Sequence, residues 1–254
     1  MIDIHCHILP GIDDGAKHMS ETIGMAKKAV EEGIHTIIAT PHHKNGKYEN
    51  TKTDIIQMVR EANAAIQGEG IPLKLLAGQE TRIYGEYLED YQKDELLPLA
   101  ESQYVFIELP SGHVPRYTEQ LLFDIQMKEL VPIIVHPERN SELIERPDRL
   151  YQLVKKGALT QVTAGSLCGY FGKKIKSFSH QLIEANLTHF IASDAHNLKS
   201  RSFMMAEAID LVDSKFGDDM VYLFTENAEL LVNGRNVMKE IPERVKRKKF
   251  LGLF

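Results

Sequence analysis

Five short segments of this chain place histidine or carboxylate residues in or beside apolar runs. They are Asp3-Ile4-His5-Cys6-His7, Thr40-Pro41-His42-His43, Gly78-Gln79-Glu80, Val135-His136-Pro137 and Ser193-Asp194-Ala195-His196. Such polar groups are costly to bury unless an opposite charge or a hydrogen-bond partner compensates them. A shared cluster of divalent metal ions would compensate all five segments together, and we therefore predict such a cluster.

The first and last segments each carry two potential ligands separated by one residue. His5 and His7 would point to the same face of a strand, where two imidazoles chelate a transition metal well. Asp194 and His196 repeat this spacing. One His-x-His pair is a weak indication, because most such histidines are ordinary surface or core residues. The whole set is harder to explain in that way, since every member would need its own hydrogen-bond partners.

Further candidate ligands stand at the ends of other apolar runs. Glu80 and Glu108 supply carboxylates that can bridge ions, and His42 and His136 each adjoin a proline that would end a strand. Five other histidines are not supported by such a position, and they are expected at the surface or around the cluster. They are His35, His43, His113, His180 and His189.

Short apolar runs alternate along the chain with longer segments of helical period. The runs that predict buried strands are residues 2–8, 36–40, 73–78, 104–109, 132–136, 159–164 and 189–193. The segments that predict helices are residues 20–32, with Ser20 as N-cap, and residues 53–67, 118–128, 142–155, 175–185 and 202–215. This order predicts an α/β fold with a parallel sheet and helices outside it.

The candidate ligands fall mainly at the carboxyl ends of the predicted strands. A barrel gathers all these ends around one mouth, whereas an open sheet leaves its first and last strands far apart. Because His5 and Asp194 can meet only in the first arrangement, we predict a seven-stranded barrel. One domain over residues 1–254 is expected, with a basic tail at 244–254 that is either a solvated end or a contact for a membrane or partner.

Composition narrows the partners and the compartment. The 254 residues are 43% hydrophobic and 26% charged with a net charge of −6, which provides no general attraction for nucleic acid. Cys6 and Cys168 suggest no disulfide framework, which favours a reducing cytoplasm. Neither a signal peptide nor a transmembrane segment is expected, and nothing in the sequence marks an oligomer interface.

Four segments resemble those of the polymerase-and-histidinol-phosphatase (PHP) superfamily. They are residues 3–16, Asp-Ile-His-Cys-His-Ile-Leu-Pro-Gly-Ile-Asp-Asp-Gly-Ala, and residues 40–43, 136–140 and 193–197. More narrowly, they are similar to its bacterial manganese-dependent protein-tyrosine phosphatases of capsule and exopolysaccharide synthesis. The resemblance implies a distorted (β/α)7 TIM-like barrel of the PHP type. It also implies phosphotyrosyl protein substrates, including a bacterial tyrosine kinase.

The resemblance further implies a site for three divalent metal ions. One ion would be held by His5, His7, Glu80 and Asp194, a second by Glu80, Glu108 and His136, and a third by Asp14, His42 and His196. Many superfamily members have histidine where Asp14 and Glu108 stand here. These two carboxylates suit hard cations, so manganese is the first expectation, with iron, zinc or magnesium as alternatives.

The expected charge of this site favours phosphate monoesters. Three divalent ions held by four carboxylates retain about two positive charges, which match a phosphate dianion. We therefore expect in-line attack by a metal-bridging hydroxide. Arg139 and Arg201 would grip phosphate oxygens, although each is equally explained as a surface arginine from the sequence alone. Either His43 or a metal-bound water would protonate the leaving group.

A cysteine nucleophile does not fit this sequence. Phosphatases of that type carry an arginine six residues after the cysteine, but Ile12 follows Cys6 and Lys174 follows Cys168 at this distance. Cys6 is expected to be a small core residue. A small-molecule phosphatase of the histidinol-phosphate type and a non-catalytic metal-binding subunit remain as alternatives. A nuclease is disfavoured by the net charge and by the lack of a basic, aromatic patch.

Overall fold

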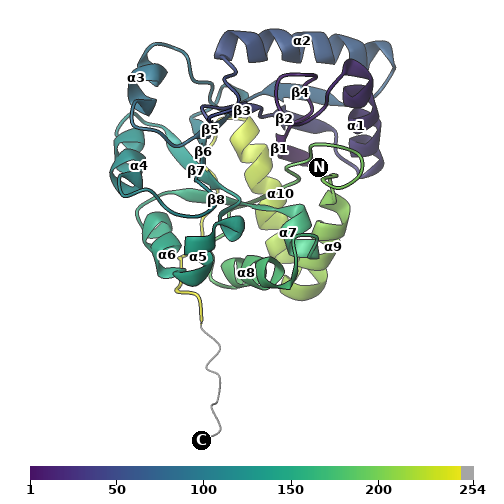
Figure 1. Ribbon diagram of the computed structural model, residues 1–254. Coiled ribbons are helices and arrows are strands. Elements are labelled where there is room, and N and C mark those ends of the chain that lie inside the picture. Colours follow the sequence, from purple (N-terminus) through teal and green to yellow (C-terminus); the bar gives the residue numbers. More distant parts are fainter. Residues whose placement is uncertain (247–254) are drawn as a thin grey trace, which may run out of the picture.

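The computed structural model describes residues 1–246 (Figure 1). Nine strands in this range form two sheets, and the strands within each sheet are parallel. The first sheet has the order β1 (Ile2–Cys6), β2 (Thr36–Ala39) and β4 (Lys74–Ala77). The second has the order β3 (His42–His43), β5 (Glu80–Arg82), β6 (Tyr104–Glu108), β7 (Val131–Val135), β8 (Leu159–Thr163) and β9 (Phe190–Ala192). The fold is therefore α/β with parallel strands, as predicted, and all seven predicted strands are present.

Strands β3 and β5 were not predicted. Each follows a predicted strand, β2 or β4, after a break of two residues, and pairs in the other sheet. Pro41 lies in the first break and has no amide hydrogen to donate, which interrupts the ladder. In the second sheet His42 lies opposite Glu80 in register, so the break brings two predicted ligands together.

The first and last strands are neighbours. The backbone amide of Asp194 donates to the carbonyl oxygen of His5 at 2.8 Å, and that of His7 donates to Ala195 at 2.9 Å. The buried Asp3 carboxylate strengthens this contact, because it accepts hydrogen bonds from the backbone amide and the hydroxyl of Ser193. His5 and Asp194 therefore lie side by side, although they are far apart in the sequence.

Five helices match predicted segments and cover the sheets in Figure 1. They are α1 (Met19–Glu31), α2 (Lys52–Gly68), α4 (Thr118–Gln126), α8 (Lys173–Glu184) and α9 (Met205–Phe216). The prediction of Ser20 as an N-cap is wrong, because α1 begins at Met19 and His18 occupies the cap position. The predicted helix 142–155 is two helices, α5 (Ser141–Glu145) and α6 (Asp148–Lys155), because Pro147 interrupts it.

Several helical elements were not predicted. They are α3 (Tyr87–Gln92), α7 (Ala164–Cys168), α10 (Asp218–Val232) and the 3-10 turns η1 (Leu99–Glu101) and η2 (Pro137–Arg139). The long helix α10 contacts β1 and β9. Among residues 1–246, none of the helices combines the length and the apolar character that crossing a bilayer requires.

Successive strand residues belong to two separate apolar clusters. Ile37, Val105 and Ile134 pack in the larger cluster, which includes residues of the surrounding helices. The residues that directly follow these three belong to a second cluster, which also contains Leu231 of α10. They are Ile38, Phe106 and Val135. This alternation is that of strands buried on both faces.

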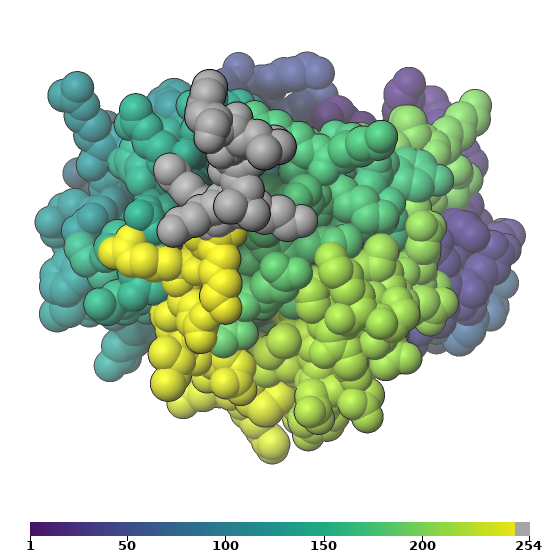
Figure 2. All heavy atoms as spheres, turned by 90° about the horizontal axis from the view of Figure 1, so that it is seen from below, coloured from purple at the N-terminus to yellow at the C-terminus, as the bar shows by residue number. Residues whose placement is uncertain are grey.

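The yellow stretch that ends at residue 246 lies on the face seen from below, beside teal and green segments of the chain (Figure 2). Arg244 pairs with Asp148 at 2.6 Å and lies over the ring of Tyr151, so this part of the predicted tail contacts α6. The rest of that tail, residues 247–254, lies outside the described residues.

Candidate metal centre

Glu80, at the start of β5, lies at the centre of a cluster of histidines. Its side chain is fully buried, and its Oε2 atom lies 3.4 Å from His5 Nε2, 3.3 Å from His7 Nε2 and 2.8 Å from His42 Nδ1. Its Oε1 atom lies 2.8 Å from His136 Nε2. Burial alone would raise the pKa of Glu80, but the surrounding histidines hold it well below its usual range. One carboxylate thus links ligands predicted for all three ions.

The predicted ligands of the first ion converge. His5, His7 and Glu80 can place one ligand atom each within 4.8 Å of one another. Asp194 joins them, with Oδ1 at 3.5 Å from His5 Nε2 and 3.3 Å from His7 Nε2. His136 and Asp194 follow β7 and β9 and adopt left-handed backbone conformations, with φ of 36° and 51°. Such strain is rare outside glycine and is often found at functional sites.

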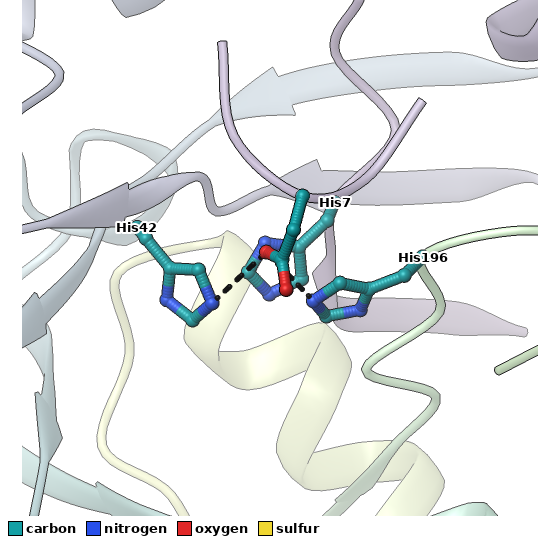
Figure 3. Close-up of side chains that lie close together, drawn as sticks. His7, His42 and His196 are labelled. Carbon is teal, nitrogen blue, oxygen red and sulfur yellow. Dashed lines mark ion pairs between the residues drawn. The ribbon is translucent and has the colours of Figure 1, made fainter. Parts of the chain in front are cut away.

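The predicted ligands of the third ion converge around Asp14. Its Oδ1 atom lies 3.3 Å from His42 Nε2 and 3.4 Å from His196 Nε2, as the dashed lines in Figure 3 show. His7 belongs to the same group of close ligand atoms and lies between the two other imidazoles in Figure 3. The neighbouring imidazoles of His196 and His42 hold the pKa of Asp14 far below its ordinary value.

The ligands predicted for the second ion, Glu80, Glu108 and His136, do not form one compact group. His42, Glu80 and Glu108 form the compact group, whereas His136 contacts Glu80. Arg82 donates two hydrogen bonds of 2.9 Å to the Glu108 carboxylate, in the forked geometry that arginine favours. Burial and the nearby Glu80 raise the pKa of Glu108 to about 7.

Two side chains and one backbone carbonyl behind the cluster orient three of its histidines. His5 Nδ1 lies 2.9 Å from Gln161 Oε1, His7 Nδ1 lies 2.6 Å from Asp13 Oδ2, and His196 Nδ1 lies 2.9 Å from a backbone carbonyl. Such acceptors hold the proton on Nδ1 and direct the Nε2 lone pair forward, as in most protein metal sites. The sequence did not predict these supporting roles of Asp13 and Gln161, nor that of Arg82. Only Asp13 has a local mark in the sequence, because it stands directly before the predicted ligand Asp14.

The buried polar atoms of the cluster fit divalent cations. Within residues 1–246, His42 Nδ1, Glu80 Oε2 and His196 Nε2 are buried without a hydrogen-bond partner. Buried atoms of this kind are costly unless something satisfies them. Cations placed among these imidazole and carboxylate groups would satisfy the free lone pairs and neutralise the buried negative charge.

Both predicted arginines reach the cluster. Arg139 Nη2 lies 2.5 Å from Asp194 Oδ2, and Arg201 Nη2 lies 3.0 Å from the same oxygen. They line a cavity of about 200 Å³, together with His136 and Asn140. This volume accommodates a phosphoryl group, and two guanidinium groups favour an anion there.

His43 is not part of this cluster. It follows His42 on β3, and successive strand residues point to opposite faces. Burial lowers the pKa of His43, and the charges that act on it are those of Lys44, Glu49 and Asp90. The structure therefore does not place His43 where it could protonate a leaving group at the cluster.

The other histidines and the cysteines divide between surface and core. His35 and His113 are exposed as expected, but His180 and His189 are buried, contrary to the prediction. The Cys6 thiol is fully buried in the core as predicted, and burial raises its pKa well above the ordinary value. A thiol in that state is a poor nucleophile.

Parallel α/β folds with histidines and carboxylates at the carboxyl ends of the strands are typical of metal-dependent hydrolases. The chain shares its fold with the phosphotriesterase homology protein of Escherichia coli, with a TM-score of 0.56 and 11% identity over 91% of this chain and 98% of that one. The chain belongs to the capsular polysaccharide synthesis CpsB/CapC family, whose model matches residues 1–233.

Relatives in this family carry phosphatase names. The tyrosine-protein phosphatase YwqE of Bacillus subtilis is 52% identical to this chain over all 254 residues, and both chains are covered completely. A putative tyrosine-protein phosphatase, CapC of Staphylococcus aureus, is 38% identical over the same length, again with both chains covered completely. A crystal structure from work on YwqE and CpsB, described as unique metal-dependent tyrosine phosphatases, matches with a TM-score of 0.95 over 97% of this chain and 100% of that one. The resemblance to bacterial tyrosine phosphatases of capsule synthesis is confirmed.

Proposed function

We propose that this chain is a metal-dependent protein-tyrosine phosphatase that acts on phosphotyrosyl proteins of capsule or exopolysaccharide synthesis, including a bacterial tyrosine kinase. The observation that carries this proposal is the convergence of five histidines and three further carboxylates around the buried Glu80, in a chain 52% identical to YwqE. The fold provides the scaffold, since contacts between β1 and the segment after β9 support a distorted barrel. It has seven strands if β2 with β3, and β4 with β5, each count as one interrupted strand.

The predicted ligand set fits three ions, and we retain manganese as the first candidate. His5, His7, Glu80 and Asp194 would hold the first ion. Glu80, Glu108 and His136 would hold the second, and Asp14, His42 and His196 the third. The closeness of His42 to Glu80 and Glu108 supports a further role for His42 at the second ion.

The protein side chains bind and orient the phosphoryl group. Bound divalent cations would supply an activated water and positive charge for the phosphoryl oxygens. Arg139 and Arg201 line the cavity and would hold the non-bridging oxygens opposite the cluster. A tyrosine leaving group has a pKa of about 10, so its departure demands only moderate help from an acid. We do not assign that role to His43, because it points away.

We further propose that residues 1–246 form one domain and that the protein works in the cytoplasm. Both Cys6 and Cys168 are free thiols, which fits a reducing compartment.

The test combines metal analysis with substrate comparison. Protein purified without chelators should contain bound transition metal and should hydrolyse a phosphotyrosyl peptide, and EDTA should abolish this activity until manganese is restored. Turnover of histidinol phosphate should be much slower. Faster turnover of histidinol phosphate would replace the proposal with the small-molecule phosphatase. Bound metal without any hydrolysis of aryl phosphates would favour the non-catalytic subunit.

A further inference from the structure

The turn between α7 and α8, with the sequence Gly169-Tyr170-Phe171-Gly172, presents two aromatic side chains in succession. Gly169 and Gly172 both adopt positive φ, 101° and 94°, which side-chain-bearing residues rarely adopt. The Tyr170 amide donates to the carbonyl of Gly165 at 2.9 Å, and the Gly172 amide donates to that of Gly169 at 3.0 Å. The backbone therefore fixes where the two rings project.

Phe171 lies directly against one of the two arginines of the cavity. The guanidinium carbon of Arg139 is 5.3 Å from the centre of the Phe171 ring, within the range of a cation–π contact. The ring also packs on α7, where a Cβ added at Gly165 would lie 3.3 Å from Phe171 Cε2. Phe171 is thus held between a helix and Arg139, and it remains partly exposed.

Tyr170 is 65% exposed and is one of the few large apolar side chains left open to solvent in residues 1–246. Its Cβ atom lies 3.8 Å from the position that a Gly165 Cβ would take, so it emerges beside Phe171. It directly precedes Phe171, the residue whose ring lies against Arg139.

We infer that Tyr170 and Phe171 form an aromatic wall that contacts the aryl ring of the substrate and selects phosphotyrosine over alkyl phosphates. This inference rests on the proposed function. A phosphoryl group held by Arg139 carries its ester ring within a few ångströms of that guanidinium, where Phe171 is stacked. Aromatic rings attract one another at centre distances of about 4.5–7 Å, and an alkyl ester has no ring to make this contact.

The experiment measures the ratio of kcat/KM for phenyl phosphate to kcat/KM for glycerol 2-phosphate in the manganese-loaded full chain. In Tyr170→Ala and Phe171→Leu this ratio should fall by about three- to tenfold, the factor expected from losing one aromatic contact. Inhibition by inorganic phosphate should change less than about twofold in Tyr170→Ala, since Tyr170 is not stacked on Arg139. Tyr222→Ala is the matched control, because Tyr222 on α10 is 62% exposed and should leave the ratio unchanged.

Other outcomes would overturn the inference. An equal loss for both esters in both variants would mean that the turn only supports Arg139. An unchanged ratio in Tyr170→Ala, an exposed site where folding is not at risk, would remove the aromatic wall even if Phe171→Leu did not fold. If the wild-type protein hydrolysed neither ester, the proposed function would fail before the variants were compared.

Discussion

The middle parts of the strands bury apolar side chains, whereas their carboxyl ends bury charged and polar side chains. In β6, Phe106 packs in the apolar cluster shared with α10, and Glu108 two residues later belongs to the polar cluster around Glu80. In β7, Val135 belongs to the same apolar cluster, and His136 directly after it contacts Glu80. The apolar region is stabilised by packing, whereas the polar region contains buried atoms without hydrogen-bond partners, which a cation would satisfy. Changes in the two regions should therefore have separable effects on stability and on activity.

The largest expected effect is on activity, from Asp194→Ala. Asp194 approaches His5 and His7 and pairs with Arg139 and Arg201. Its loss therefore removes a proposed metal ligand and leaves the two guanidinium groups without this carboxylate partner. We expect kcat/KM for a phosphotyrosyl peptide to fall on the order of 1,000-fold or more. Circular dichroism should still show a folded protein. A variant that retains a tenth of the activity would contradict the assignment.

Leu231→Ala should produce the reverse pattern. Leu231 on α10 is fully buried against the strands, and its truncation leaves a cavity. The free energy of unfolding should fall by about 3 kcal/mol, measured by urea denaturation. At 25 °C the folded variant should keep the wild-type kcat. A drop in kcat as large as that of Asp194→Ala would show that the two regions are not separable.

Asp13→Asn probes the support of the polar cluster. The carboxylate accepts from His7 Nδ1 and from the amides of Gly15 and His42, so the amide replacement weakens the orientation of His7. We expect manganese affinity or kcat/KM to fall about 10- to 100-fold, as for other residues behind metal ligands. Titration of the apoprotein with manganese measures this change. Wild-type affinity and activity together would show that Asp13 has no such role.

The smallest expected effect concerns His189, a buried histidine away from the cluster. Burial lowers its pKa to about 3, and its Nδ1 atom accepts a hydrogen bond from the Thr160 amide. In the unfolded chain His189 binds a proton below about pH 6.5, whereas in the folded protein it stays neutral until about pH 3, so stability falls as the pH is lowered through this window.

The wild-type protein should therefore lose stability between pH 7 and pH 5, and in His189→Gln this loss should be smaller by about 1–2 kcal/mol. Urea denaturation at both pH values measures the difference. Identical losses in the two proteins would show that His189 carries no part of the pH dependence.

The sequence predicted the seven main strands and the polar cluster because both leave local marks: apolar runs of strand length, and acids or histidines where those runs end. The two-residue strands β3 and β5 are too short for any periodicity to show. Asp13, Gln161 and Arg82 support ligands that come from elsewhere in the chain or from across the sheet, so their contacts exist only in the folded protein. His43 was assigned a role from its type and its place beside His42, and the alternation of side chains along β3 directs it to the other face.

The most direct test is anomalous X-ray scattering from a crystal of the full chain grown with manganese. We predict anomalous peaks surrounded by the nine proposed ligands, and we expect the Glu80 carboxylate to contact two of these peaks. Manganese bound only by exposed surface carboxylates, or no peak beside Glu80, would contradict the account.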